Sequence, residues 1–114
     1  MNIDIASYIY EILKKEQYER DPDYKELRNQ LIEHAVNYAR IRVDWKLMDV
    51  EERKKMDDLR ASTHTVFINS CNILSRYMKN NGMDSSWREK LTEDRKVIGD
   101  FACYLHCILG LRAR

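Results

Sequence analysis

Residues 24–48, YKELRNQLIEHAVNYARIRVDWKLM, carry the longest hydrophobic pattern in the chain. Their apolar side chains recur at alternating spacings of three and four residues, which is the repeat of an α-helix. One row contains Tyr24, Leu27, Leu31, His34, Tyr38, Ile41, Trp45 and Met48, and a second row beside it contains Ile32, Ala35, Val36, Ala39 and Val43. Because the two rows cover well over half of the helix surface, the segment is predicted to be a central helix that touches several neighbours.

Helix boundary signals lie on both sides of this segment. An apolar stripe predicts a first helix over about residues 4–18, and Asp21 can cap the next helix with Pro22 at its first position. Downstream, Asp49 and Glu52 have the spacing of a capping box, and they predict a third helix that reaches about residue 80. Gly82 is then predicted to adopt the left-handed conformation that typically follows a helix.

Two further helices are predicted in the C-terminal part of the chain. Ser85 or Ser86 can cap a short helix through residues 87–91, and Thr92 can cap a final helix over about residues 93–111. The chain has 114 residues with only three glycines and one proline, which leaves little material for turns. The predicted fold is therefore all-α, a compact bundle of four long helices plus one short helix in a single domain, residues 1–114.

Charge and cysteine usage limit the classes of function. The net charge is +1, so no strong field attracts nucleic acid or a membrane surface, and a protein is the expected partner. The longest apolar stretch, residues 97–111, is interrupted and too short to span a bilayer, and the N-terminus, MNIDIASYIY, does not resemble a signal peptide. Three cysteines without a disulfide spacing indicate reduced thiols and a cytoplasmic protein.

The stretch GDFACYLHCIL, residues 99–109, raises the question of metal or redox chemistry. On a helical wheel its small and weakly polar residues gather opposite the apolar face, and we take them as candidates for an interface: Gly99, Cys103, His106, Cys107 and Gly110. The final helix is thus expected to be covered on both faces, as a central element or as half of a subunit contact. Two thiols four residues apart could chelate a soft cation, but structural zinc usually takes four ligands from separate elements. We interpret the thiols as buried small apolar residues and predict no metal and no cofactor.

A second group of residues predicts a structural polar cluster near the final helix. Asp100 interrupts an apolar run, and a buried acid is costly unless it is paired. Arg88, Arg95 or Arg60 could be its partner, and Arg42 lies within the apolar arc of the long helix. The predicted cluster comprises Arg42, Trp87, Arg88, Arg95 and Asp100.

Arg60 and His64 are the candidates for catalysis. The sequence RASTH, residues 60–64, places them one turn apart on the third helix. The pair resembles the Arg-x4–6-His signature of HEPN ribonucleases, small helical bundles that dimerise to build their site. The resemblance implies that Arg60 stabilises phosphate charge while His64 moves a proton during RNA cleavage. The spacing here is one residue shorter, which turns the histidine relative to the arginine; the alternative is a histidine at the edge of the core beside an arginine paired with a carboxylate.

A broader resemblance covers two segments. Residues 61–78, ASTHTVFINSCNILSRYM, with residues 87–106, WREKLTEDRKVIGDFACYLH, resemble small uncharacterised helical proteins of Gram-positive bacteria and their mobile elements. That resemblance implies a bacterial cytoplasmic protein and brings no activity and no site residues. The leading hypothesis is a non-enzymatic protein–protein interaction module that forms a homodimer. The rival is a HEPN-like metal-independent ribonuclease, or an RNA-binding toxin-type protein, that uses Arg60 and His64.

Overall fold

A computed structural model describes residues 3–109 and contains six helices within them. The helices are α1 (Ile3–Leu13), α2 (Glu16–Glu19), α3 (Pro22–Leu47), α4 (Val50–Asn80), α5 (Trp87–Leu91) and α6 (Arg95–Leu109). This part of the chain has no strand, which confirms the all-α prediction. The expected count of one short helix is wrong, because α2 and α5 are both short.

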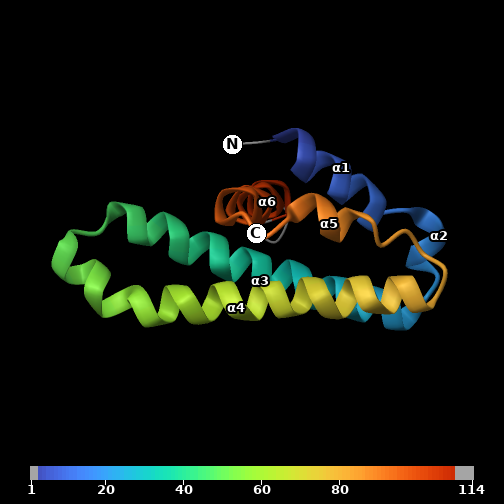
Figure 1. The fold of residues 1–114 in the computed structure, drawn as a ribbon, viewed down its shortest axis with the longest axis horizontal. Helices are drawn as coiled ribbons and strands as arrows, with labels where there is room; N and C mark the ends of the chain where they lie inside the picture. Colours follow the sequence, from blue (N-terminus) through green and yellow to red (C-terminus); the bar gives the residue numbers. More distant parts are fainter. Residues whose placement is uncertain (1–2, 110–114) are drawn as a thin grey trace.

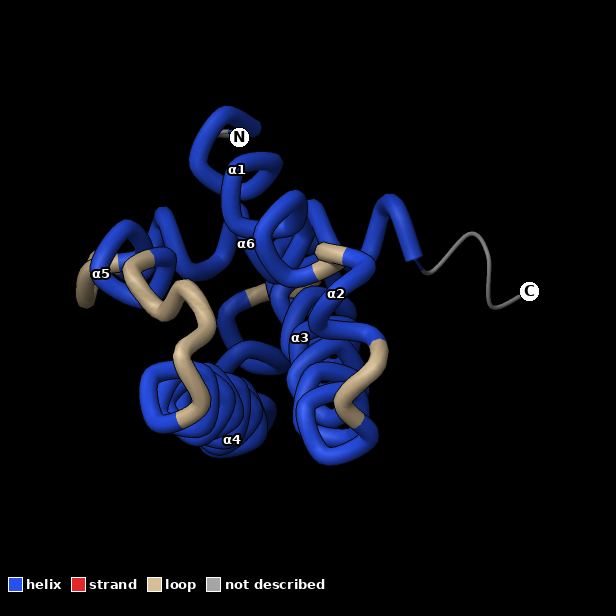
Figure 2. Tube along the Cα trace, turned by 90° about the vertical axis from the view of Figure 1, so that its right-hand side faces the viewer, coloured by secondary structure: helices blue, strands red, loops and turns tan. Residues whose placement is uncertain are grey.

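The two longest helices form an antiparallel hairpin, and the remaining helices lie along one side of it (Figure 1). The view of Figure 1 looks nearly along α6, so this helix crosses the hairpin instead of running parallel to it. Figure 2 looks down the hairpin and shows α3 and α4 side by side with the other helices above them. α3 contacts α2, α4 and α6, which confirms its predicted central position.

The predicted first helix is divided into α1 and α2. The hydroxyl of Tyr24 donates a hydrogen bond to the carbonyl oxygen of Leu13, which takes the place of a helical N–H donor. The chain then becomes extended at Lys15, with φ −54° and ψ 129°. This turn buries Tyr18, whose hydroxyl accepts the N–H of Asp84 at 3.1 Å. A single helix over 4–18 was the wrong expectation, because tertiary contacts of two tyrosines outweigh the local helical pattern.

Three of the predicted boundary signals are confirmed. The Asp21 carboxylate accepts the N–H of Tyr24 at 3.2 Å, at the start of α3. The Asp49 carboxylate accepts the N–H of Glu52 at 2.9 Å, at the start of α4. Gly82 follows α4 in the left-handed region with φ +72°. These side-chain caps satisfy N–H groups that the first turn of each helix leaves unpaired.

The predicted start of the final helix is shifted by two residues. Thr92 has φ +54°, a conformation that does not lead into a helix. Its carbonyl oxygen accepts a hydrogen bond from Arg88 at 3.2 Å. Asp94 performs the capping, because its carboxylate accepts the N–H of Lys96 at 2.8 Å. The last helix therefore begins at Arg95.

The core lies between the hairpin and the helices that cover it. Phe67 on α4 is fully buried, and its ring centroid lies 6.0 Å from that of Tyr38 on α3 and 6.1 Å from that of Phe101 on α6. The closed end of the hairpin projects beyond the covering helices (Figure 1), and there Leu47 is 83% exposed and Val50 is 67% exposed. The all-round apolar pattern of α3 therefore does not mean burial along its whole length. Within residues 3–109, no helix combines the length and apolar character needed to traverse a bilayer.

Candidate functional site

A small basic cavity lies where α3, α4 and α6 meet. Its volume is about 100 Å³, and its lining residues are Tyr38, Arg60, Ala61, His64, Thr65 and Arg95. The two candidate catalytic residues thus lie on the wall of one shared cavity. No acidic side chain belongs to this lining, as far as the described part of the chain shows. The cavity can therefore present cationic and hydrogen-bonding groups to a ligand.

Arg60 is held in place by an aromatic ring and a carboxylate. The centre of its guanidinium group lies 4.5 Å from the ring of Trp45, and Nη2 lies 3.2 Å from Asp57 on its own helix. The guanidinium group of Arg53 is also 4.5 Å from this ring, and Arg53 Nε donates to the carbonyl oxygen of Trp45 at 3.0 Å. Stacking on an indole favours a planar cation and limits its motion. Arg60 is therefore oriented before any ligand arrives.

A third arginine stands beside the cavity and depends on a glycine. Arg42 Nη1 lies 3.4 Å from the main-chain oxygen of Arg95, and its guanidinium group lies 5.9 Å from the ring of Tyr38. Gly99 is buried beneath this side chain, and a Cβ atom at position 99 would collide with the guanidinium group. Gly99 thus makes room for a side chain of the same protomer, and not for the backbone of another helix.

The environment of His64 favours its neutral form. Burial lowers the pKa of His64, and the positive charges of Arg95, Arg60 and Arg42 lower it further, while Glu93 has the opposite effect. The ring of Tyr38 lies edge-on to the imidazole, with centroids 5.2 Å apart. The Nε2 atom of His64 and the Nε atom of Arg60 are buried and have no hydrogen-bond partner among the described residues. Two residues of the cavity lining thus carry buried polar atoms without a protein partner.

The lowered pKa of His64 makes the stability of the protein dependent on pH. An unfolded histidine titrates near pH 6.5, so between that value and the lower folded pKa the unfolded chain binds more protons. The free energy of unfolding should therefore fall as the pH is lowered through this range. Urea unfolding can be measured at about pH 7.5 and about pH 5.5 in buffers without phosphate or sulfate. Between these two pH values, the free energy of unfolding should fall less for His64→Gln than for the unchanged protein. Equal losses in the two proteins would contradict the assigned environment of His64.

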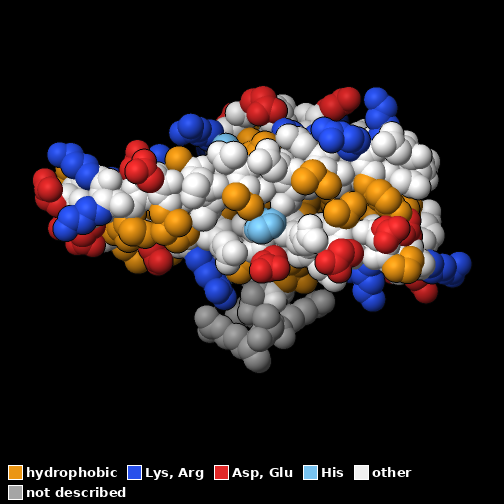
Figure 3. All heavy atoms as spheres, turned by 90° about the horizontal axis from the view of Figure 1, so that it is seen from below, with side chains coloured by type: hydrophobic (Ala, Val, Ile, Leu, Met, Phe, Trp, Pro, Cys, Tyr) orange, Lys and Arg blue, Asp and Glu red, His pale blue; other side chains and the backbone are white. Residues whose placement is uncertain are grey.

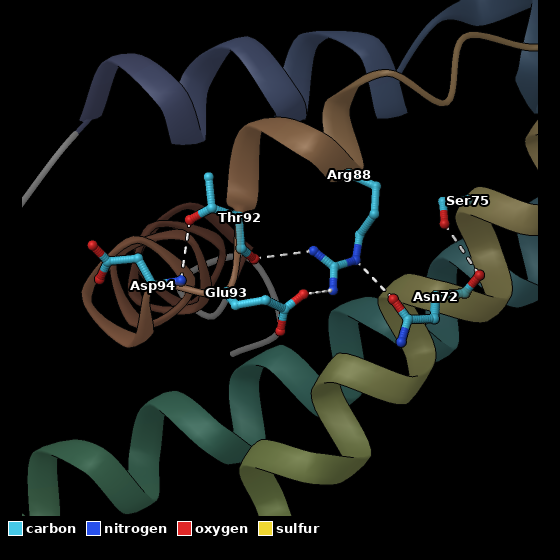
Figure 4. Close-up of polar contacts among 6 residues, drawn as sticks. All are labelled: Asn72, Ser75, Arg88, Thr92, Glu93 and Asp94. Carbon is cyan, nitrogen blue, oxygen red and sulfur yellow. Dashed lines mark hydrogen bonds and ion pairs between the residues drawn. The ribbon is translucent and has the colours of Figure 1, made fainter.

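The structure divides the predicted polar cluster among three places. Arg88 donates to Asn72 on α4 at 2.7 Å and pairs with Glu93 at 3.0 Å, so it joins α5 to α4 and to the segment before α6 (Figure 4). Arg42 and Arg95 lie together at the basic cavity. Trp87 is fully buried in the core, where its ring N–H donates to the sulfur of Met78 at 3.2 Å. Arg42 and Arg95 thus lie together as predicted, whereas Trp87 belongs to the core and not to a polar cluster. Asp100 is half-buried on α6.

The stripe of small residues on α6 is only partly covered. Cys103 and His106 are half-buried, whereas Cys107 is exposed, so the expectation that both faces of this helix are covered is wrong at Cys107. Gly110, the last residue of the predicted stripe, lies outside the described residues. Burial raises the pKa of Cys71 to about 12 and also raises that of Cys103, which keeps these thiols protonated and unreactive. In the range 3–109, no three or more His, Cys, Asp and Glu side chains gather as metal ligands.

An exposed apolar row runs along α4. Leu59 is 44% exposed, Val66 is 41% exposed and Ile73 is 49% exposed, and successive members are seven residues apart. Seven residues are nearly two helical turns, so the three side chains share one face of the helix. We call this row the α4 stripe. It borders a groove between α3 and α4 that is lined by His34, Asn37, Ser62, Thr63 and Val66.

Figure 3 shows the molecule from the hairpin side, where hydrophobic side chains lie in small groups among charged and polar ones. Two features of this molecule escape a pattern analysis of the sequence: the partnership of Trp45 with Arg60, and the edge contact of Tyr38 with His64. The signal that could reveal them is the short hairpin connection, which places the last turns of α3 against the first turns of α4.

No family model, curated protein or solved structure matches this chain.

Proposed function

We propose that the protein is a non-enzymatic helical interaction module that forms a homodimer through the α4 stripe. The observation that carries this proposal is the row of three exposed aliphatic side chains, Leu59, Val66 and Ile73, at seven-residue intervals. Such spacing is typical of helices that pair along their length. α4 has 31 residues and is therefore about 46 Å long, which is enough for an extended contact.

The polar residues beside the α4 stripe support its burial in a dimer. Ser62 and Thr63 donate their hydroxyl hydrogens to the carbonyl oxygen of Leu59, at 3.2 Å and 3.0 Å. Because these hydroxyl donors are already paired within the helix, covering this face would leave none of them unsatisfied.

A twofold axis through Val66 gives an arrangement that uses the whole stripe. In an antiparallel pair of α4 helices, Val66 meets the same residue of the partner, and Leu59 of one protomer faces Ile73 of the other. Such an interface is self-complementary and closes at two copies, which is the commonest form of homo-oligomer.

A charge at the centre of the stripe tests the dimer. Val66→Glu places two like charges at the twofold axis and removes the central apolar contact, so the dissociation constant should rise at least roughly a hundredfold. Val50→Glu is the matched control, because Val50 is 67% exposed at the closed end of the hairpin, outside the stripe. Sedimentation equilibrium over a wide concentration range should show a dimer for the unchanged protein and for Val50→Glu, and a monomer for Val66→Glu. A monomer at every concentration for the unchanged protein would end the proposal.

The position of Arg60 and His64 on one cavity favours RNA cleavage as a second candidate function. In this mechanism neutral His64 accepts the proton of a ribose 2′-hydroxyl, whose oxygen attacks the adjacent phosphorus and displaces the 5′-oxygen. Arg60 stabilises the charge on the phosphate oxygens, and the leaving oxygen takes a proton from solvent or from the protonated histidine. The lowered pKa of His64 supports its role as a base, because the neutral form prevails near neutral pH.

Replacement of the histidine tests the second candidate. His64→Ala should reduce cleavage of a single-stranded RNA by roughly a hundredfold to ten-thousandfold, the usual contribution of a general base. Circular dichroism must show that the variant remains folded, and His34→Ala is the matched control because His34 lines the separate groove between α3 and α4. If the unchanged protein leaves RNA intact, or if the two variants cleave equally, this function is excluded.

A further inference from the structure

The lining of the basic cavity carries positive charge and no acidic side chain among the described residues. Arg60 and Arg95 line it, and Arg42 approaches from α3, so three arginines from three different helices converge on His64. Two acids lie near it: Asp57 pairs with Arg60 itself at 3.2 Å, and Glu93 pairs with Arg88 at 3.0 Å. Asp57 is 60% exposed, and Glu93 is 82% exposed. Like charges repel one another, and an anion within the cavity would reduce the repulsion among the arginines.

Two residues of the cavity lining also carry buried nitrogen atoms without hydrogen-bond partners. Arg60 Nε and His64 Nε2 have no hydrogen-bond partner among residues 3–109. Arg60 Nε always carries a hydrogen, and His64 Nε2 donates when the ring proton is on that nitrogen. Hydrogen bonds from charged donors to anionic oxygens are among the strongest that proteins make. The two residues lie one turn apart on α4 and line the same cavity.

The size of the cavity restricts the anion. About 100 Å³ accommodates a few water molecules or one tetrahedral oxyanion. We infer that the cavity among α3, α4 and α6 binds a single phosphate group, held by Arg60, His64 and Arg95, with Arg42 adding charge from behind. This inference goes beyond self-association, and it requires no cleavage of RNA.

Gly99 contributes indirectly to the site. The absence of a side chain at this position lets the Arg42 guanidinium lie against α6 beside the main-chain oxygen of Arg95. A methyl group there would displace only the end of a flexible side chain, so the fold should tolerate Gly99→Ala. Gly99 is therefore a positioning residue for Arg42, and its replacement tests the third arginine without removing any charge.

Thermal unfolding in the presence of anions tests the inference. Inorganic phosphate and sulfate should raise the melting temperature in a saturable way, whereas sodium chloride at the same ionic strength should not. Arg95→Ala removes one charged donor from an exposed position and should weaken binding at least roughly tenfold. Arg76→Ala is the matched control, because Arg76 is an exposed arginine of α4 that does not line the cavity. Gly99→Ala should remain folded and bind more weakly than Arg76→Ala.

Two nucleotide probes separate the sources of the phosphate. Stabilisation by adenosine 5′-monophosphate, but not by adenosine, identifies a phosphate carried by a small molecule. Stabilisation by the inorganic ions alone identifies the free ion, and both results support the site. The inference is overturned if phosphate and sulfate act no more strongly than chloride, or if Arg76→Ala weakens binding as much as Arg95→Ala. Val66→Glu, which should be monomeric, should still be stabilised by phosphate. The anion site can therefore be tested independently of the proposed dimer.

Discussion

Phe67→Ala should lower the free energy of unfolding by about 3–5 kcal/mol. Phe67 is fully buried. Its ring lies between Tyr38 on α3 and Phe101 on α6. Removing the ring leaves a cavity where three helices meet, and the surrounding side chains can fill such a space only in part. Since small domains have a total stability of about 5–15 kcal/mol, the loss would be a large share of it.

Urea unfolding followed by circular dichroism measures this effect. Phe67→Leu is the matched control, because it retains most of the apolar volume and should cost less than half as much. The alanine variant should also bind phosphate more weakly, since Tyr38 lies between Phe67 and His64 and loses its support on one side. A loss below about 1 kcal/mol, the value of an ordinary substitution, would show that Phe67 does not hold the three helices together.

The sequence is a good guide to this fold wherever structure depends on neighbouring residues. Asp21, Asp49 and Gly82 mark helix ends through short-range hydrogen bonds and backbone conformation, and all three are confirmed. The break between α1 and α2 could not be predicted in this way. It depends on Tyr24 reaching back to Leu13 and on Tyr18 meeting Asp84, which is 66 residues further along the chain.

The candidate site shows the same division between local and distant information. One turn of helix separates Arg60 from His64, so their shared cavity follows from spacing. The contributions of Tyr38, Trp45 and Arg95 arise from the packing of α3 and α6 against α4, which depends on contacts far apart in sequence. The sequence therefore placed Arg42 and Arg95 in one cluster, but it did not predict that they lie beside Arg60 and His64.

Trp87→Ala should also lower the free energy of unfolding by about 3–5 kcal/mol. Trp87 is fully buried, although the charged residues around it suggest a polar cluster. It belongs to α5, a helix of five residues whose preceding Ser86 makes no capping hydrogen bond through its side chain. A helix this short has little stability of its own, so the packing of Trp87 and Leu91 must hold it in place.

The consequence should extend from the core to the polar network above it. Arg88 follows Trp87 directly and joins Asn72 to Glu93, so loss of the indole should release these contacts as well. Hydrogen exchange of the amides of residues 87–91 should then accelerate more than exchange in the centre of α3. Trp87→Phe is the control that separates apolar volume from the ring N–H, which donates to Met78. If apolar volume dominates, Trp87→Phe should lose less than half of the free energy of unfolding that Trp87→Ala loses. If the two variants lose the same amount, the hydrogen bond to the sulfur of Met78 is what anchors α5.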